Sequence, residues 1–138
     1  MLLELATPTR LLVSSEVDEV VAPGSEGYFG VLPGHAPFLT TLTAGELTYR
    51  HGRDEQHLAV IGGFAEVSGD HVIILAEAAE RPEEIDRTRA ERAKQRAEQR
   101  LAGRSPTATG EEIDYTRALA ALARALARLR VLGYPIHA

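Results

Sequence analysis

The sequence predicts a β-sandwich of about ten short antiparallel strands followed by a C-terminal α-helical hairpin. Short apolar or alternating runs recur roughly every 8 to 10 residues in the first part of the chain, between turn-forming residues. Nine of the 12 glycines precede residue 80, whereas alanine gathers in the second part with arginine and glutamate. We therefore divide the 138 residues into a sandwich domain, residues 1–82, and a two-helix domain, residues 83–138.

Nine strand-forming runs occur in the first domain. Pairs such as Pro23-Gly24, Pro33-Gly34 and Gly62-Gly63 separate them, and no interval is long enough for the crossover helix of a parallel sheet. Residues 72–75 are continuously apolar, which indicates a strand buried on both faces. The predicted strands are residues 2–6, 11–13, 17–22, 28–32, 38–42, 46–50, 57–61, 64–67 and 72–76.

Two helices are predicted in the second domain. Pro82 suits the first turn of a helix, and a helix over residues 83–101 follows it. Thr109 and Glu112 have the spacing of a capping box, which predicts a second helix over residues 111–131. The short connection between the two helices predicts an antiparallel hairpin.

The two predicted helices differ in their apolar surfaces. Burying the alanines of the first helix gains little, because hydrophobic stabilisation scales with the area removed from water. We therefore expect a hairpin that packs closely but weakly, as a detachable element would. The apolar stripes are Ala90, Ala93, Ala97 and Leu101 in the first helix and Leu119, Leu122, Leu126 and Leu129 in the second, where Arg117, Arg124 and Arg128 lie nearly opposite the leucines.

The composition excludes several classes of function. The chain has no cysteine, which rules out disulfides and cysteine-ligated metal sites. No window approaches the ~20 apolar residues of a membrane span and the start lacks a signal-peptide pattern, so we expect an untargeted intracellular chain. The five histidines lack zinc-site spacing, and the sequence contains neither a phosphate-binding loop nor a nucleophile elbow. We expect no active site of its own.

The net charge of −5 is divided unevenly along the chain. Residues 1–80 contain three basic and twelve acidic side chains, whereas residues 81–138 contain twelve basic and eight acidic ones. The chain is acidic overall and its basic helix lacks interleaved aromatic side chains, so nucleic acid is not an expected partner. The arginines of that helix would instead suit phosphate groups or an acidic protein surface.

The frame I-D-x-x-R-A occurs near the start of each predicted helix. It begins at Ile85 and again at Ile113. The simplest interpretation is an Asp to Arg pair beside each helix N-terminus, which contributes about 0.2–0.5 kcal/mol.

The segment GSEGYFGVLPGHAP, residues 24–37, resembles the hallmark turn of the epsilon subunit of bacterial F-type ATP synthases. Residues 62–67 and 74–80 resemble the next two strands of that family, and the resemblance covers essentially the whole chain. It implies a non-catalytic rotor subunit of the central stalk, which couples rotation and proton transport to ATP synthesis. It also implies a place at the cytoplasmic face of the cell membrane, held only through the complex. A free-standing nucleotide-sensing module is the alternative.

The same resemblance implies partners for the sandwich domain, namely the gamma subunit and the membrane c-ring. The matching contact residues are Ser25, Glu26, Tyr28 and His35. Tyr28 departs from the family, which often has a polar or charged residue there. His35 has a second interpretation as a turn residue that is hydrogen-bonded to backbone.

In this family the hairpin is the regulatory part. Folded on the sandwich, it permits ATP hydrolysis. Extended along the stalk, its second helix would reach an acidic segment of the catalytic beta subunit, within the alpha/beta head, through Arg117, Arg124 and Arg128, and would block hydrolysis. A weakly docked hairpin is the bistable element that such a switch requires.

Some relatives bind a regulatory ATP in the folded hairpin, and no cofactor is obligatory. Bound ATP would hold the hairpin closed. The competing interpretation is that the same aspartate and arginine side chains form salt bridges across the hairpin. The residues that match the ATP ligands are Glu80, Ile85, Asp86, Arg89, Ala90, Arg96, Arg124 and Arg128.

Overall fold

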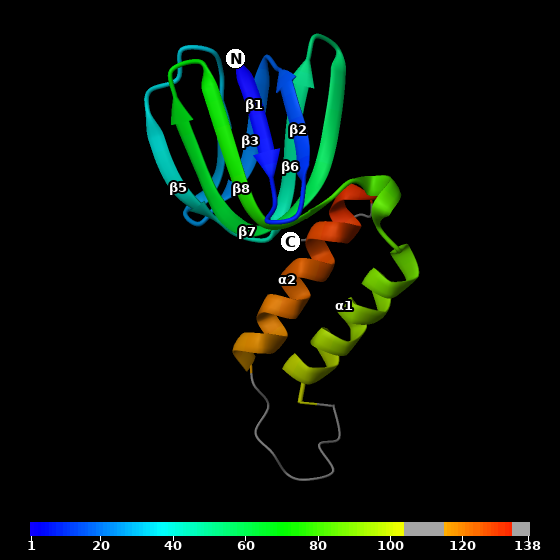
Figure 1. Ribbon diagram of the computed structural model, residues 1–138. Helices are drawn as coiled ribbons and strands as arrows, with labels where there is room; N and C mark the ends of the chain where they lie inside the picture. The colour runs from blue at the N-terminus through cyan, green and yellow to red at the C-terminus, as the bar shows by residue number, and fades with distance from the viewer. Residues whose placement is uncertain (104–114, 134–138) are drawn as a thin grey trace.

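The computed structural model describes residues 1–103 and 115–133, and it has the predicted class: a β-sandwich with a two-helix hairpin beneath it (Figure 1). A 3₁₀ turn, η1 (Pro82–Glu84), joins the sandwich to α1 (Arg87–Leu101), and α2 (Tyr115–Val131) returns to the sandwich. The strands are β1 (Leu2–Ala6), β2 (Leu11–Glu16), β3 (Glu19–Gly24), β4 (Gly27–Val31), β5 (Phe38–Leu42), β6 (Gly45–His51), β7 (Asp54–Ser68) and β8 (His71–Glu80).

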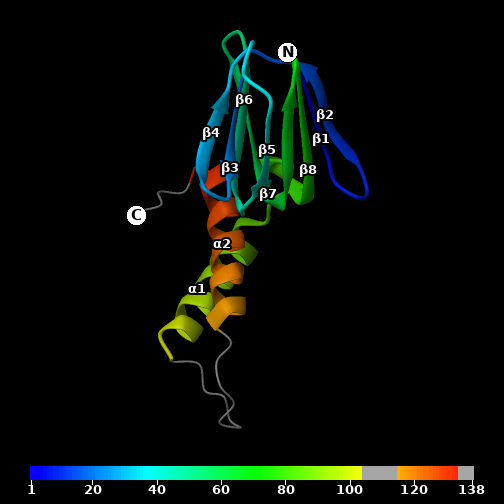
Figure 2. The same ribbon diagram turned by 90° about the vertical axis from the view of Figure 1, so that its left-hand side faces the viewer.

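The strands pair in the order β2-β1-β8-β7-β5-β3-β4, and β6 pairs with β3 and β7. One pair differs from the predicted antiparallel arrangement, because β1 runs parallel to β8. These are the first and last strands of the sandwich, so no tight turn fixes their relative direction. Seen from its edge in Figure 2, the sandwich has β3, β4 and β6 on one side and β1, β2 and β8 on the other.

The runs predicted at residues 57–61 and 64–67 belong to one long strand, β7. Gly62 and Gly63 lie inside this strand with φ of +65° and +113°, so they bend it instead of ending it. A Cβ atom at Gly63 would lie 2.0 Å from the Leu75 carbonyl oxygen, which only glycine avoids. The bend lets the first half of β7 pair with β6 and the second half with β5.

The core of the sandwich consists of branched aliphatic side chains. The largest of them, including Leu3, Leu5, Leu47, Leu58 and Ile74, are 0% exposed. Val72 and Ile74 come from the apolar run in β8, but the prediction that this strand is buried on both faces was wrong, because Leu75 on the other face is 54% exposed. Full burial of each such side chain is worth about 1.5–3 kcal/mol relative to leaving it in water, so this domain is strongly stabilised without the hairpin.

The first helix begins later than predicted. Pro82–Glu84 form only the 3₁₀ turn, and Ile85 and Asp86 are extended. The Asp86 carboxylate then caps α1 by accepting a hydrogen bond of 3.0 Å from the Arg89 backbone N–H. The capping box predicted at Thr109 and Glu112 lies outside the described residues, as does the start of the second I-D-x-x-R-A frame.

The hairpin packs through alanine. The buried residues of α1 are Ala90 and Ala97, and α1 packs against α2, which in turn packs on β6 and β7. The leucine stripe predicted as the apolar face of α2 is unevenly buried: Leu119 is 57% exposed, Leu122 and Leu126 are half-buried, and Leu129 is buried. Small side chains such as Ala90 and Ala97 let two helix backbones approach closely.

No helix in the described ranges is long and apolar enough to cross a membrane.

Candidate functional site

A cleft of about 400 Å³ lies where the hairpin meets the end of the sandwich. Its walls come from four elements: the end of β8, η1, α1 and α2. It therefore exists only while the hairpin is folded against the sandwich. The lining residues are Glu80, Glu84, Asp86, Arg89, Ala90, Ala93, Arg96, Ala97, Arg100, Ala121, Arg124 and Arg128.

The charge of the cleft is graded along α1. Its three carboxylates lie within residues 80–86, at the junction with the sandwich, and they face five arginines. Arg100 is eleven residues beyond Arg89, which places the two Cα atoms about 16 Å apart along the helix axis. The alanines between them leave room for a ligand. The cleft thus offers hydrogen-bond acceptors at one end and guanidinium groups along its length, with an excess of two positive charges.

The contacts of the cleft tie the hairpin to the sandwich. Arg128 on α2 donates from Nε to Glu80 Oε1 at 2.8 Å, and its Nη2 lies at the same distance from that oxygen. Glu80 is the last residue of β8, so this ion pair joins the two domains. The Asp86 carboxylate accepts the capping hydrogen bond from the Arg89 backbone N–H, which is a main-chain donor and not a guanidinium group.

The structure brings together seven of the eight predicted ATP ligands. Ile85 is the exception, because it lies in the extended stretch before α1 and does not line the cleft. Glu84 and Arg100 line the cleft but were not predicted. Arg100 follows Arg96 at the i,i+4 spacing that places both on one helix face, which was a usable sequence signal. Glu84 lies just before the I-D-x-x-R-A frame, and its role depends on a tertiary contact that sequence spacing does not encode.

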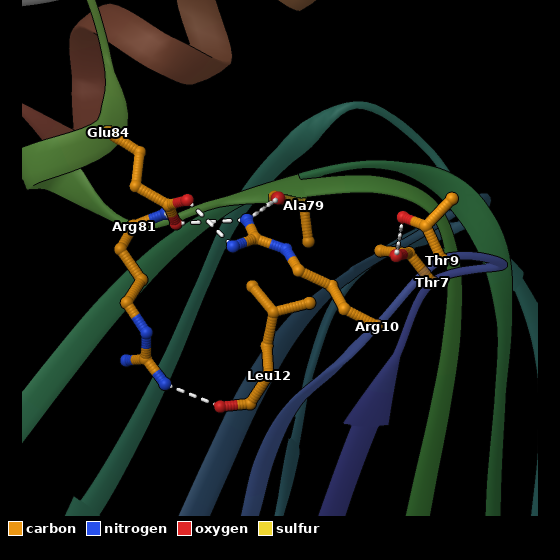
Figure 3. Close-up of polar contacts among 7 residues, drawn as sticks. All are labelled: Thr7, Thr9, Arg10, Leu12, Ala79, Arg81 and Glu84. Atoms are coloured by element: carbon orange, nitrogen blue, oxygen red, sulfur yellow. Dashed lines mark hydrogen bonds and ion pairs between the residues drawn. The ribbon is translucent and has the colours of Figure 1, made fainter.

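Figure 3 shows that tertiary contact, which we call the junction clamp (Arg10, Arg81 and Glu84). Arg10, in the turn between β1 and β2, places Nη1 at 2.7 Å from Glu84 Oε2 and donates from Nη2 to Glu84 Oε1 at 3.0 Å. The Arg81 backbone N–H donates to the same Oε1 at 2.9 Å, and the Arg81 side chain donates to the Leu12 carbonyl. The Arg10 hydrogen bond and then that of Arg81 hold the pKa of Glu84 below its usual value.

A second set of contacts holds the C-terminal end of α2. Arg130 places Nε at 3.5 Å from Glu46 Oε1 on β6, and its guanidinium carbon lies 5.1 Å from the centre of the Tyr28 ring. Arg87 at the start of α1 donates to the Leu132 carbonyl at 3.3 Å, which closes the hairpin on itself. These are partly exposed polar contacts, which are individually weak.

The predicted partner residues of the sandwich lie in β4 and in the turns on either side of it. Ser25 and Glu26 form the exposed β3–β4 turn, where the Ser25 hydroxyl contacts that of Thr41. Tyr28 is 47% exposed, and its hydroxyl accepts a hydrogen bond from the Glu46 backbone N–H at 3.1 Å. His35 is half-buried, and its Nδ1 lies 2.6 Å from the neighbouring Ala36 carbonyl oxygen. Their contacts with partner subunits stay a prediction, as do those of the exposed Arg117.

The sandwich also exposes an apolar surface that the sequence analysis missed. Phe64 lies directly opposite Leu75, Leu75 beside Ala6, and Ala6 opposite Leu11. Opposite residues share one face of a sheet, and Leu39 is on the same face of β5 as Thr41, the partner of Phe64. We call this surface the outer apolar row; its members Leu11, Leu39, Phe64 and Leu75 are 59%, 70%, 56% and 54% exposed.

Comparison with known proteins identifies the family. The model of the ATP synthase delta/epsilon chain β-sandwich domain matches residues 1–82, and that of the long α-helix domain of the same chain matches residues 83–133. The chain belongs to the epsilon-subunit family of F-type ATP synthases. It is therefore a non-catalytic subunit of the central stalk of that complex.

Epsilon chains of two bacteria illustrate the similarity. The epsilon chain of Nitratidesulfovibrio vulgaris is 55% identical over 131 residues, which cover 95% of this chain and 94% of that one. The epsilon chain of Syntrophobacter fumaroxidans is 54% identical over 129 residues, which cover 94% and 92%.

Solved structures agree with this assignment. A chain of the Euglena gracilis mitochondrial ATP synthase, in a structure of OSCP, F1 and c-ring, matches with a TM-score of 0.77 and 25% identity over 96% of this chain and 80% of that one. A chain from the central stalk and c-ring of the Tetrahymena thermophila enzyme, at 14% identity and a TM-score of 0.56 over 96% and 92% of the two chains, shares the fold.

Proposed function

We propose that this epsilon-family chain couples rotation to ATP synthesis in the central stalk and that its hairpin inhibits ATP hydrolysis unless ATP holds it folded. The observation that supports this most is the composition of the cleft. Its lining comes from β8, η1, α1 and α2 together, so a ligand bound there contacts both domains and both helices. Such a ligand binds the folded arrangement and not the extended one.

The chemistry of the cleft suits a nucleoside triphosphate. Guanidinium groups bind phosphate oxygens with paired, charge-assisted hydrogen bonds, and Arg96, Arg100 and Arg124 are placed for such a role along the hairpin. Glu80 and Asp86 at the junction end are acceptors for an adenine amino group or ribose hydroxyls. A volume of about 400 Å³ falls within the range of pockets for ligands of this size.

Binding of ATP would shift the hairpin by mass action. A ligand at a hundred times its dissociation constant stabilises the state that binds it by about 2.7 kcal/mol. The ion pairs Arg128–Glu80 and Arg130–Glu46 that join the hairpin to the sandwich are partly exposed, so a shift of this size is large relative to them.

Inhibition and ATP binding would use the same side chains. Arg124 and Arg128 line the cleft in the folded hairpin, and Arg128 is paired with Glu80 there. In an extended hairpin both would leave these partners and, with Arg117, would be available to an acidic segment of the beta subunit. The two functions are therefore mutually exclusive, which is what a switch needs.

The outer apolar row supports docking on the gamma subunit. An exposed strip of leucine and phenylalanine on a sheet face marks an interaction surface. Glu66 and Glu77 lie exposed on the same face, so the matching partner surface is apolar with a basic rim. Contact with the c-ring, at the cytoplasmic face of the membrane, is assigned to the β3–β4 turn by resemblance, and the Euglena neighbour belongs to an assembly that includes a c-ring.

The nucleotide function is tested by titrating the full chain with ATP while backbone amide resonances are followed by NMR. We expect shifts in α1, α2 and the end of β8 for the wild type and their loss in Arg124→Ala. Arg53→Ala in the β6–β7 turn is the matched control, because it removes the same charge outside the cleft. Absence of shifts at millimolar ATP would refute nucleotide binding.

The inhibitory function is tested in the reconstituted ATP synthase. Removal of residues 111–138 should raise ATP hydrolysis, and added ATP should no longer change the degree of inhibition. Hydrolysis at the wild-type rate would count against an inhibitory hairpin.

The docking surface is tested by a pull-down with the cognate gamma subunit. Leu75→Glu places a carboxylate in the outer apolar row and should abolish binding, whereas Leu119→Glu makes the same change on exposed α2 and should not. Equal binding by both variants would exclude this face, and no binding by the wild type would favour a free-standing nucleotide sensor.

A further inference from the structure

The junction clamp joins one wall of the cleft to a distant part of the sandwich. Arg10 and Glu84 are 74 positions apart in the sequence, yet two arginine nitrogens meet the two oxygens of one carboxylate. Arg10 Nη2 also donates to the Ala79 carbonyl at 3.2 Å, which fixes the orientation of the guanidinium group (Figure 3). A forked pair with an oriented arginine is more specific in geometry than a single ion pair.

Glu84 is the member of the clamp that reaches the cleft. It lines the cleft together with five arginines, whereas Arg10 is not among the described lining residues. Both Glu84 oxygens are occupied by Arg10, and one also by the Arg81 backbone N–H. The Glu84 side chain is 33% exposed, so most of it is shielded from solvent while the clamp is formed.

A released Glu84 would have other partners. Its carboxylate would be one charged group among arginines that we assign to phosphate binding, and a carboxylate competes with phosphate for a guanidinium group. Arg10 both neutralises Glu84 and holds it at the edge of the cleft. An unpaired charge close to a bound triphosphate would also repel it directly.

We propose that Arg10 is a positioning residue of the nucleotide cleft: it keeps Glu84 from occupying the cleft arginines, so that these arginines remain available to the phosphates of the ligand. This inference rests on the proposed nucleotide function and adds a control element from the β1–β2 turn to it. Arg10 acts through Glu84 and does not itself touch the ligand.

The inference differs from a purely structural role in one measurable way. If the clamp only braces the junction, any variant that breaks it weakens the cleft equally. If Arg10 restrains Glu84, the loss of Arg10 is harmful only while Glu84 is charged. Replacing Glu84 by glutamine in the Arg10→Ala background then restores binding, although the clamp stays broken.

The experiment measures the dissociation constants of ATP and of inorganic tripolyphosphate for the full-length chain by isothermal titration calorimetry. We expect Arg10→Ala to bind both probes about three- to tenfold more weakly than the wild type. The double variant Arg10→Ala/Glu84→Gln should return to within about twofold, as expected for loss of the competing charge. Arg53→Ala is the control for loss of a positive charge, and circular dichroism confirms that each variant is folded.

Three results would overturn the inference. The inference requires Arg10→Ala to bind ATP more weakly than the wild type, so an unchanged affinity of this variant excludes it. Equal weakening of the single and double variants would show a bracing role only. A wild-type chain that binds neither probe would overturn the nucleotide cleft and this inference together, whereas either of the first two results leaves the cleft intact.

Discussion

The sandwich and the hairpin of this chain are stabilised by different kinds of contact. The sandwich buries large aliphatic side chains such as Leu47, Leu58 and Ile74 completely, whereas the buried residues of α1 are two alanines. The sandwich is also joined to the hairpin by polar contacts at Glu80 and Glu46 whose arginine partners are partly exposed. Burial of large apolar side chains therefore dominates in the sandwich, whereas the alanine contacts of α1 and the ion pairs of α2 are individually weaker, which suits the movable hairpin proposed above.

The junction between them belongs to the sandwich. Up to Glu84 the chain is fixed by Arg10 and by the Arg81 contact with Leu12, and the next two residues, Ile85 and Asp86, are extended. The apolar contact of the hairpin with the sandwich is made by α2. The extended hairpin proposed above would therefore have to break these α2 contacts.

The largest effect is expected in the sandwich core. Leu47→Ala should lower the free energy of unfolding by about 2–5 kcal/mol, because it removes buried methyl groups and leaves a cavity. The exposed Leu119→Ala on α2 should change it by less than about 0.5 kcal/mol. Urea unfolding of both variants measures the contrast, and similar losses would show that the hairpin shares the stability of the core.

Overpacking the hairpin should separate the two domains in their response. Ala97 is 2% exposed, and leucine there would push α1 from α2 at a cost of about 1–3 kcal/mol. Amide hydrogen exchange should accelerate in α1 and remain unchanged in β7 and β8. Faster exchange in the strands as well would mean that the hairpin and sandwich unfold as one unit.

A smaller effect is expected from the contacts at the C-terminal end of α2. Arg130→Ala removes both the Glu46 ion pair and the contact with the Tyr28 ring, together about 1 kcal/mol. The reconstituted ATP synthase should then be more inhibited at a given ATP concentration, since the folded hairpin is weakened. Arg87→Ala, which removes the hydrogen bond from α1 to the Leu132 carbonyl within the hairpin, serves for comparison. Unchanged inhibition in Arg130→Ala would show that this contact does not hold the folded state.

The smallest effect is the pH dependence of Glu84. Its pKa in the folded chain lies below the ordinary value of 4.5, chiefly because of the Arg10 hydrogen bond, so folding favours the ionised form. The resulting stabilisation is present above pH 4.5 and is lost as the pH falls through the lower folded pKa. Glu84→Gln should cost at most about 1 kcal/mol at pH 7 and less at about pH 3. Urea unfolding at both pH values measures this, and a pH-independent difference would contradict it.

The sequence was most informative where local rules dominate. The approximate positions of the strands followed from the apolar runs between turn-forming residues, although several strands are longer than predicted, and the seven cleft residues followed from resemblance to a family motif. It was less informative where a tertiary contact decides. Gly62-Gly63 indicated a break but proved to be a bend inside β7, because the strand continues through a close approach to Leu75 that only the fold reveals.

The leucines of α2 and the junction clamp illustrate the same limit. Periodicity placed Leu119 and Leu129 on one stripe, but it does not say which neighbour the stripe meets, and Leu119 is exposed while Leu129 is buried. Arg10 and Glu84 have no sequence relation to each other, so their pairing is visible only in three dimensions.

The central claim is that ATP stabilises the hairpin and not the sandwich. Amide hydrogen exchange of the full chain with and without saturating ATP tests it most directly. We predict slower exchange throughout α1 and α2, by about a hundredfold at a hundred times the dissociation constant, with unchanged exchange in the core strands. Equal slowing in both domains, or none in the hairpin while ATP is bound, would contradict the account.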